Sequence, residues 1–441
     1  MGESANHVAD LSAAEKRELL AQLLTEKAAG SLQIPAEACR FDLFPEVQQL
    51  HQQQEQIQRL GIQNPYFSTH TGTALNTTTI AGRELINFAT YNYLGLSGHP
   101  SVSAAAKEAI DCYGTSVSAS RVASGEKPLH LELERGIAKL IGVEDCVTFV
   151  AGHATNVTTI SHLFGPNDLI LYDALSHNSV IQGCQLSGAR AIAFPHSNSA
   201  ALETLLQKQR QQYRRVLIVI EGIYSADGDI PPLPDFIELK QRYKTFLMVD
   251  EAHSIGVLGQ HGRGISEYFG IDPTDVDVWM GTLSKSFASC GGYIAGSKTL
   301  VDYLKCTAPG FVYSIGMSPA NTAAALAALE QLSAEPERVA QLHERSQFFL
   351  ELAQSKGLNT GISQHSAIVP VIVGDTLKAF RLSQILLQMG INVQPMIYPS
   401  VPKNEDRLRF FISCLHTKDQ LRTTVAAVSA ALEQIDRADV P

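Results

Sequence analysis

The sequence lacks any uninterrupted apolar run approaching the roughly 20 residues that a membrane-spanning helix needs, so no membrane span is expected. It also lacks clustered Lys and Arg, and its 34 basic and 44 acidic residues give a formal net charge of −10. Because affinity for phosphate backbones depends on clustered basic side chains, a nucleic-acid binder is not expected either. Hydrophobic residues at 45% and charged residues at 18% instead indicate a soluble globular protein with small-molecule or protein partners.

The seven cysteines are scattered without a CxxC pair, and the amino-terminal residues contain no apolar signal region. Disulfide frameworks and secreted proteins are therefore not indicated, and we expect a reducing, cytoplasmic location. No metal site is predicted.

Two helices are predicted near the amino terminus. Residues 11–29 begin with a capping box of Ser12 and Glu15, carry regularly spaced leucines and stop at Gly30. A second, glutamine-rich helix is expected between Pro45 and Gly61. Both can simply pack at the periphery of the protein. The first also has a short resemblance to segments that join domains in modular polyketide and nonribosomal peptide synthases, which favours a linker or docking helix as the alternative.

From about residue 145, short runs rich in β-branched residues alternate with helical stretches, a pattern typical of a parallel sheet with crossover helices. Ligands bind at the carboxyl ends of the strands in such open sheets. Candidate chemical residues, among them His177, Ser225 and Asp250, follow directly after predicted strands. The predicted strands are residues 146–150, 169–172, 191–194, 216–220, 246–249 and 276–280.

A long helix is predicted from Ser318 to about residue 333, because a capping serine precedes a proline and an alanine-rich stretch. It leads toward a smaller domain of mixed helices and strands, which indicates the α+β type. The predicted elements of that domain are helices near 336–355, 376–389 and 417–434 and strands near 367–373 and 407–413.

These patterns predict an α/β protein in three segments. Residues 1–80 form a helical linker or arm, residues 81–325 a large domain with a mostly parallel sheet, and residues 326–441 a small α+β domain.

Three residues point to one cofactor. Lys285 lies in a short turn rich in Ser and Thr, where its amine can form a Schiff base with an aldehyde. Asp250 ends an apolar strand and can pair with a protonated pyridine nitrogen, and His253 can hydrogen-bond a phenolic oxygen. Each has an ordinary explanation alone: a solvated lysine, a helix cap and a structural histidine. Together they favour pyridoxal 5'-phosphate (PLP), which carries all three groups.

Two further segments suit the same cofactor. Near Gly152 and His153 a predicted strand runs into glycine and then a helix, whose free backbone amides can bind a phosphate. His177 follows another strand and can stack on a pyridine ring.

The order of several motifs resembles that of the α-oxoamine synthases, which are fold type I PLP enzymes. The resemblance covers about residues 85–435 and implies a large PLP-binding domain with a smaller carboxyl-terminal domain. The motifs are residues 88–96, 114–125, 175–179, 221–229, 249–253 and 281–285.

The resemblance also implies roles for individual residues. Lys285 would hold the cofactor as a Schiff base and transfer a proton, and Asp250 would hold the pyridine nitrogen. The other implied cofactor contacts are His177 on the ring, Ser225 and His253 on the phenolic oxygen side, and Thr282, Gly152 and His153 at the phosphate. The implied substrate contacts are Asn92, Ser400 and Arg409, of which Arg409 suits a substrate carboxylate because a guanidinium binds it with two parallel hydrogen bonds.

The resulting prediction is a PLP-dependent enzyme that joins an amino acid to an acyl thioester, releasing carbon dioxide and a free thiol. The acyl group arrives on coenzyme A or on an acyl carrier protein, and a homodimer is expected. An aminotransferase or an aldolase-like lyase is the alternative chemistry, since one cofactor site supports several reactions. A docking or scaffold subunit of a synthase assembly is the alternative outside catalysis.

Overall fold

The computed structural model describes residues 12–29 and 34–438, and the chain divides into two compact units, residues 1–64 and 65–441. In the part of the chain that the structure describes, no helix is long and apolar enough to span a bilayer.

The amino-terminal unit contains the two predicted helices, α2 (Ala13–Ala29) and α3 (Pro45–Arg59). The capping box is present, because the Ser12 backbone N–H donates to the Glu15 carboxylate over 2.8 Å. Residue 11 and the predicted stop at Gly30 lie outside the described residues. Two short 3₁₀ turns, η1 (Ala36–Ala38) and η2 (Phe41–Leu43), precede α3.

The second unit is built around a seven-stranded sheet with the order β4-β10-β9-β8-β7-β5-β6. Six strands run parallel to one another, and β10 lies antiparallel between β4 and β9. The predicted mostly parallel sheet is therefore confirmed. The strands are β4 (Asp145–Phe149), β5 (Leu169–Asp173), β6 (Arg190–Phe194), β7 (Val216–Glu221), β8 (Phe246–Asp250), β9 (Val278–Thr282) and β10 (Gly292–Gly296).

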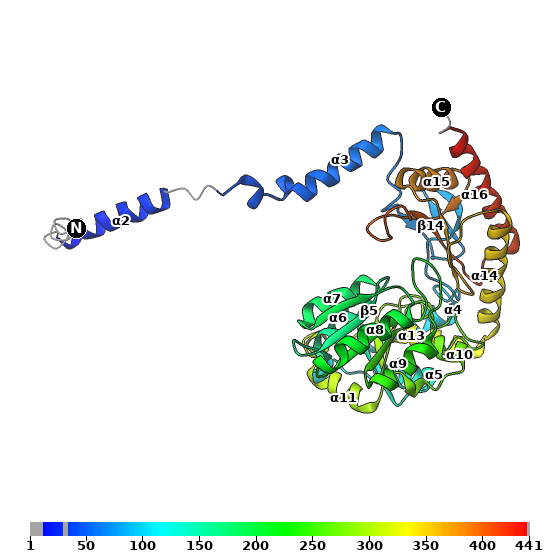
Figure 1. Cartoon of the computed structure of the whole chain (residues 1–441), viewed down its shortest axis with the longest axis horizontal. Coiled ribbons are helices and arrows are strands. Elements are labelled where there is room, and N and C mark those ends of the chain that lie inside the picture. The colour runs from blue at the N-terminus through cyan, green and yellow to red at the C-terminus, as the bar shows by residue number, and fades with distance from the viewer. Residues whose placement is uncertain (1–11, 30–33, 439–441) are drawn as a thin grey trace. The chain divides into compact units, whose positions relative to one another are not determined.

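Alternation along each strand gives the sheet two apolar faces. In β8, Leu247 and Val249 belong to one core cluster and Met248 to the other. Helices therefore cover both faces of the sheet (Figure 1). The face of Val249 meets α5 (Pro128–Ile141), α8 (Ser199–Gln209), α9 (Leu233–Tyr243) and α13 (Pro319–Ala334), and the face of Met248 meets α6 (Gly152–Leu163), α7 (Asn178–Ser187), α11 (Lys298–Thr307) and α12 (Pro309–Val312).

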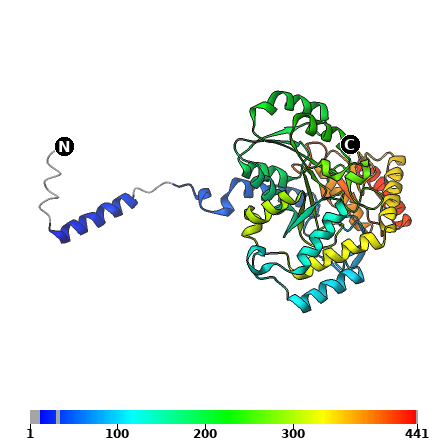
Figure 2. The ribbon, with the colours of Figure 1, turned by 90° about the horizontal axis from the view of Figure 1, so that it is seen from below.

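The carboxyl-terminal elements form a second, smaller layered structure, as predicted. A three-stranded antiparallel sheet has the order β11-β14-β13. Its apolar face, which includes Phe410, packs on helices that include Phe349. In Figure 2 these yellow-to-red helices lie together at one end of the second unit. The elements are α14 (Glu337–Ser355), β11 (Ile368–Ile372), α15 (Thr376–Gln388), β13 (Pro395–Met396), β14 (Arg407–Phe411) and α16 (Lys418–Ala438).

A third sheet, which the sequence pattern did not predict, has the order β1-β2-β3-β12. Its last strand comes from the carboxyl-terminal part of the chain and pairs in parallel with β3, where Ile391 faces Ile86. The strands are β1 (His70–Thr71), β2 (Thr77–Ile80), β3 (Arg83–Asn87) and β12 (Ile391–Asn392).

The remaining elements connect these layers. Among them, α4 packs on α13, and a single π-helical turn, η3, precedes α5. The elements are α4 (Pro100–Tyr113), η3 (Arg121–Gly125), η4 (Arg210–Gln212), α10 (Ile265–Phe269) and η5 (Pro273–Asp275).

Candidate active site

The predicted residues gather at the carboxyl edge of the large sheet. Asp250 and Thr282 are the last residues of β8 and β9, and Glu221, the last residue of β7, pairs with Asp250 in the sheet register. Asp250 lies two residues after Met248 and Thr282 two residues after Met280, so both side chains extend the sheet face that α6 and α7 cover.

Asp250 is buried and held by two hydrogen bonds. The Asn156 side-chain amide donates to Asp250 Oδ2 over 2.8 Å, and the Ala252 backbone N–H donates to Oδ1 over 2.9 Å. The same Asn156 amide donates to Ser179 Oγ over 2.9 Å. Asn156 thus links α6, α7 and β8 and fixes the direction of the carboxylate.

His177 has a defined hydrogen-bonding state. Its Nδ1 lies 2.7 Å from Ser179 Oγ and accepts the Ser179 backbone N–H over 3.3 Å. Since Nδ1 accepts a hydrogen bond, the neutral ring carries its hydrogen on Nε2. Burial lowers the pKa of His177. The neighbouring Asp250 raises it, whereas Lys285 and His153 lower it further. The backbone N–H of His177 also donates to the buried Glu221 carboxylate.

Lys285 lies in the turn after β9 with its ammonium group 5.5 Å from the centre of the Tyr91 ring. Burial lowers the pKa of Lys285 to about 8, although Asp250 and Glu221 oppose the shift. Burial also raises the pKa of Glu221 well above its ordinary value, and the neighbouring Asp250 adds to that shift. An amine whose pKa is lowered toward neutral pH is suited to nucleophilic and proton-transfer chemistry.

His253 and Arg409 complete the cluster. Burial lowers the pKa of His253 well below its ordinary value, and Lys285 and Arg409 lower it further. Its Nδ1 lies 2.8 Å from the Tyr93 hydroxyl. Arg409, on β14, donates to the Ser225 carbonyl over 2.8 Å, and its guanidinium lies 4.5 Å from the centre of the Phe411 ring.

The two remaining predicted substrate residues, Asn92 and Ser400, lie in different environments. The buried Asn92 side chain donates to the Ala74 carbonyl and accepts the Ser97 N–H, so its contacts in this structure are with backbone groups. Ser400 lies in an exposed segment between β13 and β14. Their substrate contacts stay predictions.

The start of α6 offers a place for the cofactor phosphate. A Cβ added at Gly152 would lie 2.7 Å from Thr282 Oγ1, so the helix start and the end of β9 approach each other more closely than any other residue type allows. Free backbone N–H groups at a helix start bind phosphate. His153 lies in the same turn with its ring centre 6.3 Å from that of His177.

These residues fit PLP. The cluster supplies an amine for the aldehyde carbon, a carboxylate for the pyridine nitrogen, an imidazole for the ring face and a helix start for the phosphate. One buried polar atom beside Asp250, Asn156 Oδ1, has no hydrogen-bond partner among the described residues. An unsatisfied polar atom is expected where a ligand belongs.

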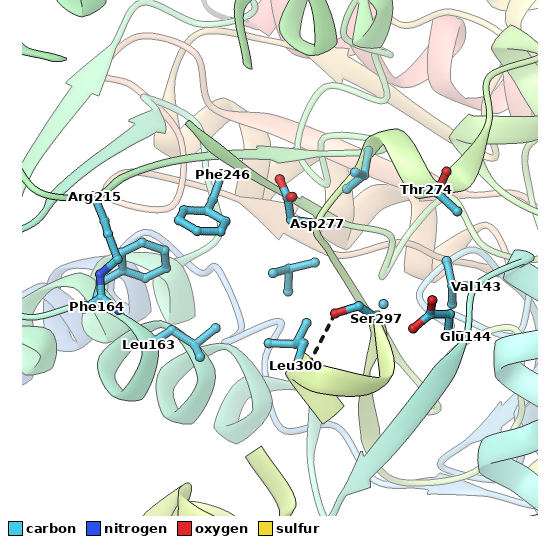
Figure 3. A pocket seen from close by; sticks show the side chains of 13 residues that line it. Val143, Glu144, Leu163, Phe164, Arg215, Phe246, Thr274, Asp277, Ser297 and Leu300 are labelled. Atoms are coloured by element: carbon cyan, nitrogen blue, oxygen red, sulfur yellow. Dashed lines mark hydrogen bonds between the residues drawn. The ribbon is translucent and has the colours of Figure 1, made fainter. Parts of the chain in front are cut away.

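A separate cavity of about 280 Å³ lies at the amino ends of β4, β8 and β9 (Figure 3). This is the opposite edge of the sheet from Asp250 and Thr282, and the cavity contains none of the predicted catalytic residues. Its lining combines apolar and charged side chains, including Phe164, Phe246, Leu300, Glu144, Arg215 and Asp277.

A family model, aminotransferase class I and II, matches residues 83–428. The chain belongs to this family. Among its relatives, an 8-amino-7-oxononanoate synthase of Symbiobacterium thermophilum is 40% identical over 348 residues, which cover 79% of this chain and 88% of that protein.

Solved structures agree with this assignment. A serine palmitoyltransferase of Sphingomonas wittichii is 30% identical with a TM-score of 0.85 and covers 90% of this chain and 99% of its own. Another, from S. paucimobilis with a bound PLP–myriocin aldimine, is 28% identical with a TM-score of 0.86 and covers 90% of this chain and 100% of its own.

The predicted fold type I architecture, the PLP cofactor and the α-oxoamine synthase type are therefore confirmed. The chain is a PLP-dependent acyltransferase that condenses an amino acid with an acyl thioester and releases carbon dioxide.

Sequence reasoning missed Asn156, Ser179 and Glu221 as parts of the site. Ser179 and Glu221 lie within the motifs 175–179 and 221–229, and Asn156 follows shortly after His153. Nothing in the sequence distinguishes them from ordinary polar residues. Their importance arises from contacts between α6, α7 and the strand ends, which only the fold brings together.

Proposed function

We propose that this chain performs its condensation at the cluster of Lys285, Asp250, His177, His253 and Arg409. The observation that carries the proposal is the position of a half-buried lysine, whose pKa is lowered to about 8, near a buried, hydrogen-bonded aspartate at the carboxyl edge of the sheet. Such an edge is the usual ligand site of open α/β sheets.

When bound, PLP supplies an electron sink for the charge that forms at the amino acid Cα. Lys285 Nζ removes the Cα proton and later returns one, and its lowered pKa suits both directions. Asp250 keeps the pyridine nitrogen protonated, since Asn156 and Ala252 orient its carboxylate. Arg409 binds the substrate carboxylate through its guanidinium.

His177 has a second role in the proposal. Its Nε2–H is free to donate because Ser179 occupies Nδ1. It can therefore stabilise negative charge on the thioester oxygen when the carbon–carbon bond forms, as preorganised donors do in acyl transfer. Ser225 and His253 are assigned to the phenolic oxygen side of the cofactor, and Gly152, His153 and Thr282 to its phosphate.

The role of Asp250 is tested by exchange of the Cα proton in deuterated water. Asp250→Asn keeps the shape but removes the charge, so we expect exchange to slow by at least about 100-fold, as for loss of one strong electrostatic contact. Asp302→Asn, on the exposed face of α11, is the matched control. Undiminished exchange in Asp250→Asn with PLP bound would show that the electron sink does not depend on this carboxylate.

For the acyl donor, we propose a carrier-protein-bound thioester, with acyl-coenzyme A as the alternative. The amino-terminal unit supports a carrier, because residues 1–64 form a compact unit of their own that contains none of the proposed site residues. Protein contacts would raise the effective concentration of the tethered thioester at Lys285. Comparing kcat/KM for one acyl group on both donors decides between them.

For the assembly, we propose a closed two-fold homodimer in the cytoplasm. Fold type I enzymes typically place the cofactor at a homodimer interface, and the segment 114–125 resembles the part that lies near it. Its Val122 side chain and the adjacent Tyr113 are exposed in the single chain, as expected of residues that a second copy covers. Sedimentation of the active enzyme tests this assembly.

A further inference from the structure

The loop that follows β3 brings a tyrosine against His253. Tyr93 is 1% exposed and His253 is 7% exposed, and the tyrosine hydroxyl lies 2.8 Å from His253 Nδ1. The two residues are 160 positions apart in the chain. This contact is therefore made by the fold and not by a local turn.

The direction of this hydrogen bond follows from what the hydroxyl can reach. Among the described residues, the only hydrogen-bond partner of the Tyr93 hydroxyl is His253 Nδ1. A buried hydroxyl hydrogen needs an acceptor, so Tyr93 donates and Nδ1 accepts. If Nδ1 were the donor, the hydroxyl hydrogen would be buried without a partner, which costs about 1–3 kcal/mol.

The surroundings keep the His253 ring neutral. Lys285 and Arg409 are both close enough to disfavour an imidazolium, and the ring is buried. A neutral imidazole with an accepting Nδ1 carries its hydrogen on Nε2. The remaining nitrogen is therefore a donor.

We propose that Tyr93 is a positioning residue that fixes His253 as an Nε2–H donor toward the phenolic oxygen of PLP. The proposal rests on the proposed function, because it takes from it that His253 contacts that oxygen. A fixed donor stabilises negative charge on the oxygen and so favours the proton on the Schiff base nitrogen. The opposite tautomer would present a lone pair to the same oxygen and repel it.

The tautomer is measured directly by ¹⁵N NMR of the full chain labelled at histidine, with and without PLP. The His253 signals are assigned by their loss in His253→Gln. In the unmodified chain we expect an accepting Nδ1 and a protonated Nε2 in both states. A protonated Nδ1 in the unmodified chain would overturn the proposal, and the only variant this test needs is the His253→Gln protein used for assignment.

Tyr93→Phe removes only the donor. We expect the His253 ¹⁵N pattern to move toward a mixture of tautomers and the visible absorbance of bound PLP to lose intensity at the longer wavelength. We also expect kcat to fall roughly 10-fold with KM unchanged, the effect of about one hydrogen bond. A tyrosine with a purely structural role would lower stability without moving the spectrum or the tautomer.

Tyr293→Phe is the matched control, because Tyr293 is fully buried and its hydroxyl has no hydrogen-bond partner among the described residues. If Tyr93→Phe behaves like Tyr293→Phe in both NMR and absorbance, the proposal is wrong. If the tautomer changes but the absorbance of bound PLP does not, the assigned link to the cofactor is overturned. Failure of the unmodified chain to bind PLP at Lys285 would instead refute the proposed function.

Discussion

Lys285 derives its chemistry from burial. A lysine in water is protonated at neutral pH, but burial lowers the pKa of Lys285 to about 8 while Asp250 and Glu221 partly oppose the change. The carboxylates keep the ammonium form accessible, and burial makes the free amine accessible. Both forms are needed by a residue that bonds an aldehyde and then moves a proton.

A pH-dependent reactivity follows. In protein stripped of PLP, acylation of Lys285 should rise with pH and reach half of its maximum near pH 8, because only the uncharged amine reacts. Labelling across a pH series followed by mass spectrometry measures it, with the exposed Lys139 on α5 in the same samples as an internal standard. A midpoint at the ordinary lysine value of 10.5 would contradict this account of the site.

The sequence alone predicted the residues whose types are chemically distinctive. Lys285, Asp250, His177 and His253 are predicted to contact PLP. The structure places them at one edge of the sheet, and their contacts with the cofactor stay predictions. The residues that orient them were not predicted. Tyr93, for example, lies in the motif 88–96, but its hydrogen bond to His253 spans 160 positions and depends on how two loops meet.

At the scale of elements, a largely buried ion cluster joins the ends of β5 and β6 to the segment that follows β7. His196 follows β6 and lies 2.9 Å from both Asp173, at the end of β5, and Asp229. Asp229 lies in the segment between β7 and α9 that also carries Ser225. Burial lowers the pKa of His196, but the two carboxylates outweigh this and raise it to about 10. The cluster thus fastens the Ser225 segment to the sheet.

Replacing this histidine tests the cluster. His196→Gln should lower the free energy of unfolding by about 3–5 kcal/mol near neutral pH, since it leaves buried carboxylates unpaired. Because the folded-state pKa is raised above 6.5, the stabilisation is complete below pH 6.5 and disappears as pH rises through about 10. Urea unfolding at several pH values measures it.

The control for that series is His365→Gln, at an exposed position in the segment before β11. The account of the cluster fails if the difference between the unmodified chain and His196→Gln stays constant, or grows, as pH rises through 10.

The sequence pattern predicted six of the seven strands of the large sheet and missed β10. Gly292 and Gly296 lie at the two ends of this strand, and glycine has a low preference for strands. At Gly292 an added Cβ would lie 2.8 Å from Gly152 Cα, so the glycine is required by the close approach of α6. Close packing against α6 thus requires a glycine in this strand, and glycine weakens the sequence pattern from which a strand is predicted.

At the scale of the whole molecule, all of the proposed site residues lie in the unit 65–441. We therefore expect the fragment 65–441 to fold, bind PLP and retain kcat with an acyl-coenzyme A substrate. If the amino-terminal unit recruits a carrier protein, the deletion should lower kcat/KM at least about 100-fold, and only for the carrier-bound donor. Equal losses with both donors would remove the docking role.

The predicted three-part division of the chain stays a prediction, and residues 70–87 show why sequence patterns describe such boundaries poorly. These residues precede the large sheet in sequence, yet β3 pairs with β12 from the carboxyl-terminal part of the chain. Strand pairing over this separation depends on the completed fold, which no local composition shift reports.

The most direct measurement is the position of the covalent bond to PLP. The protein with bound cofactor is reduced with borohydride and digested, and its peptides are mapped by mass spectrometry. The account predicts a single pyridoxyl label on Lys285, in the turn between β9 and β10. A label on any other lysine, or bound PLP that leaves no label on Lys285, would contradict it.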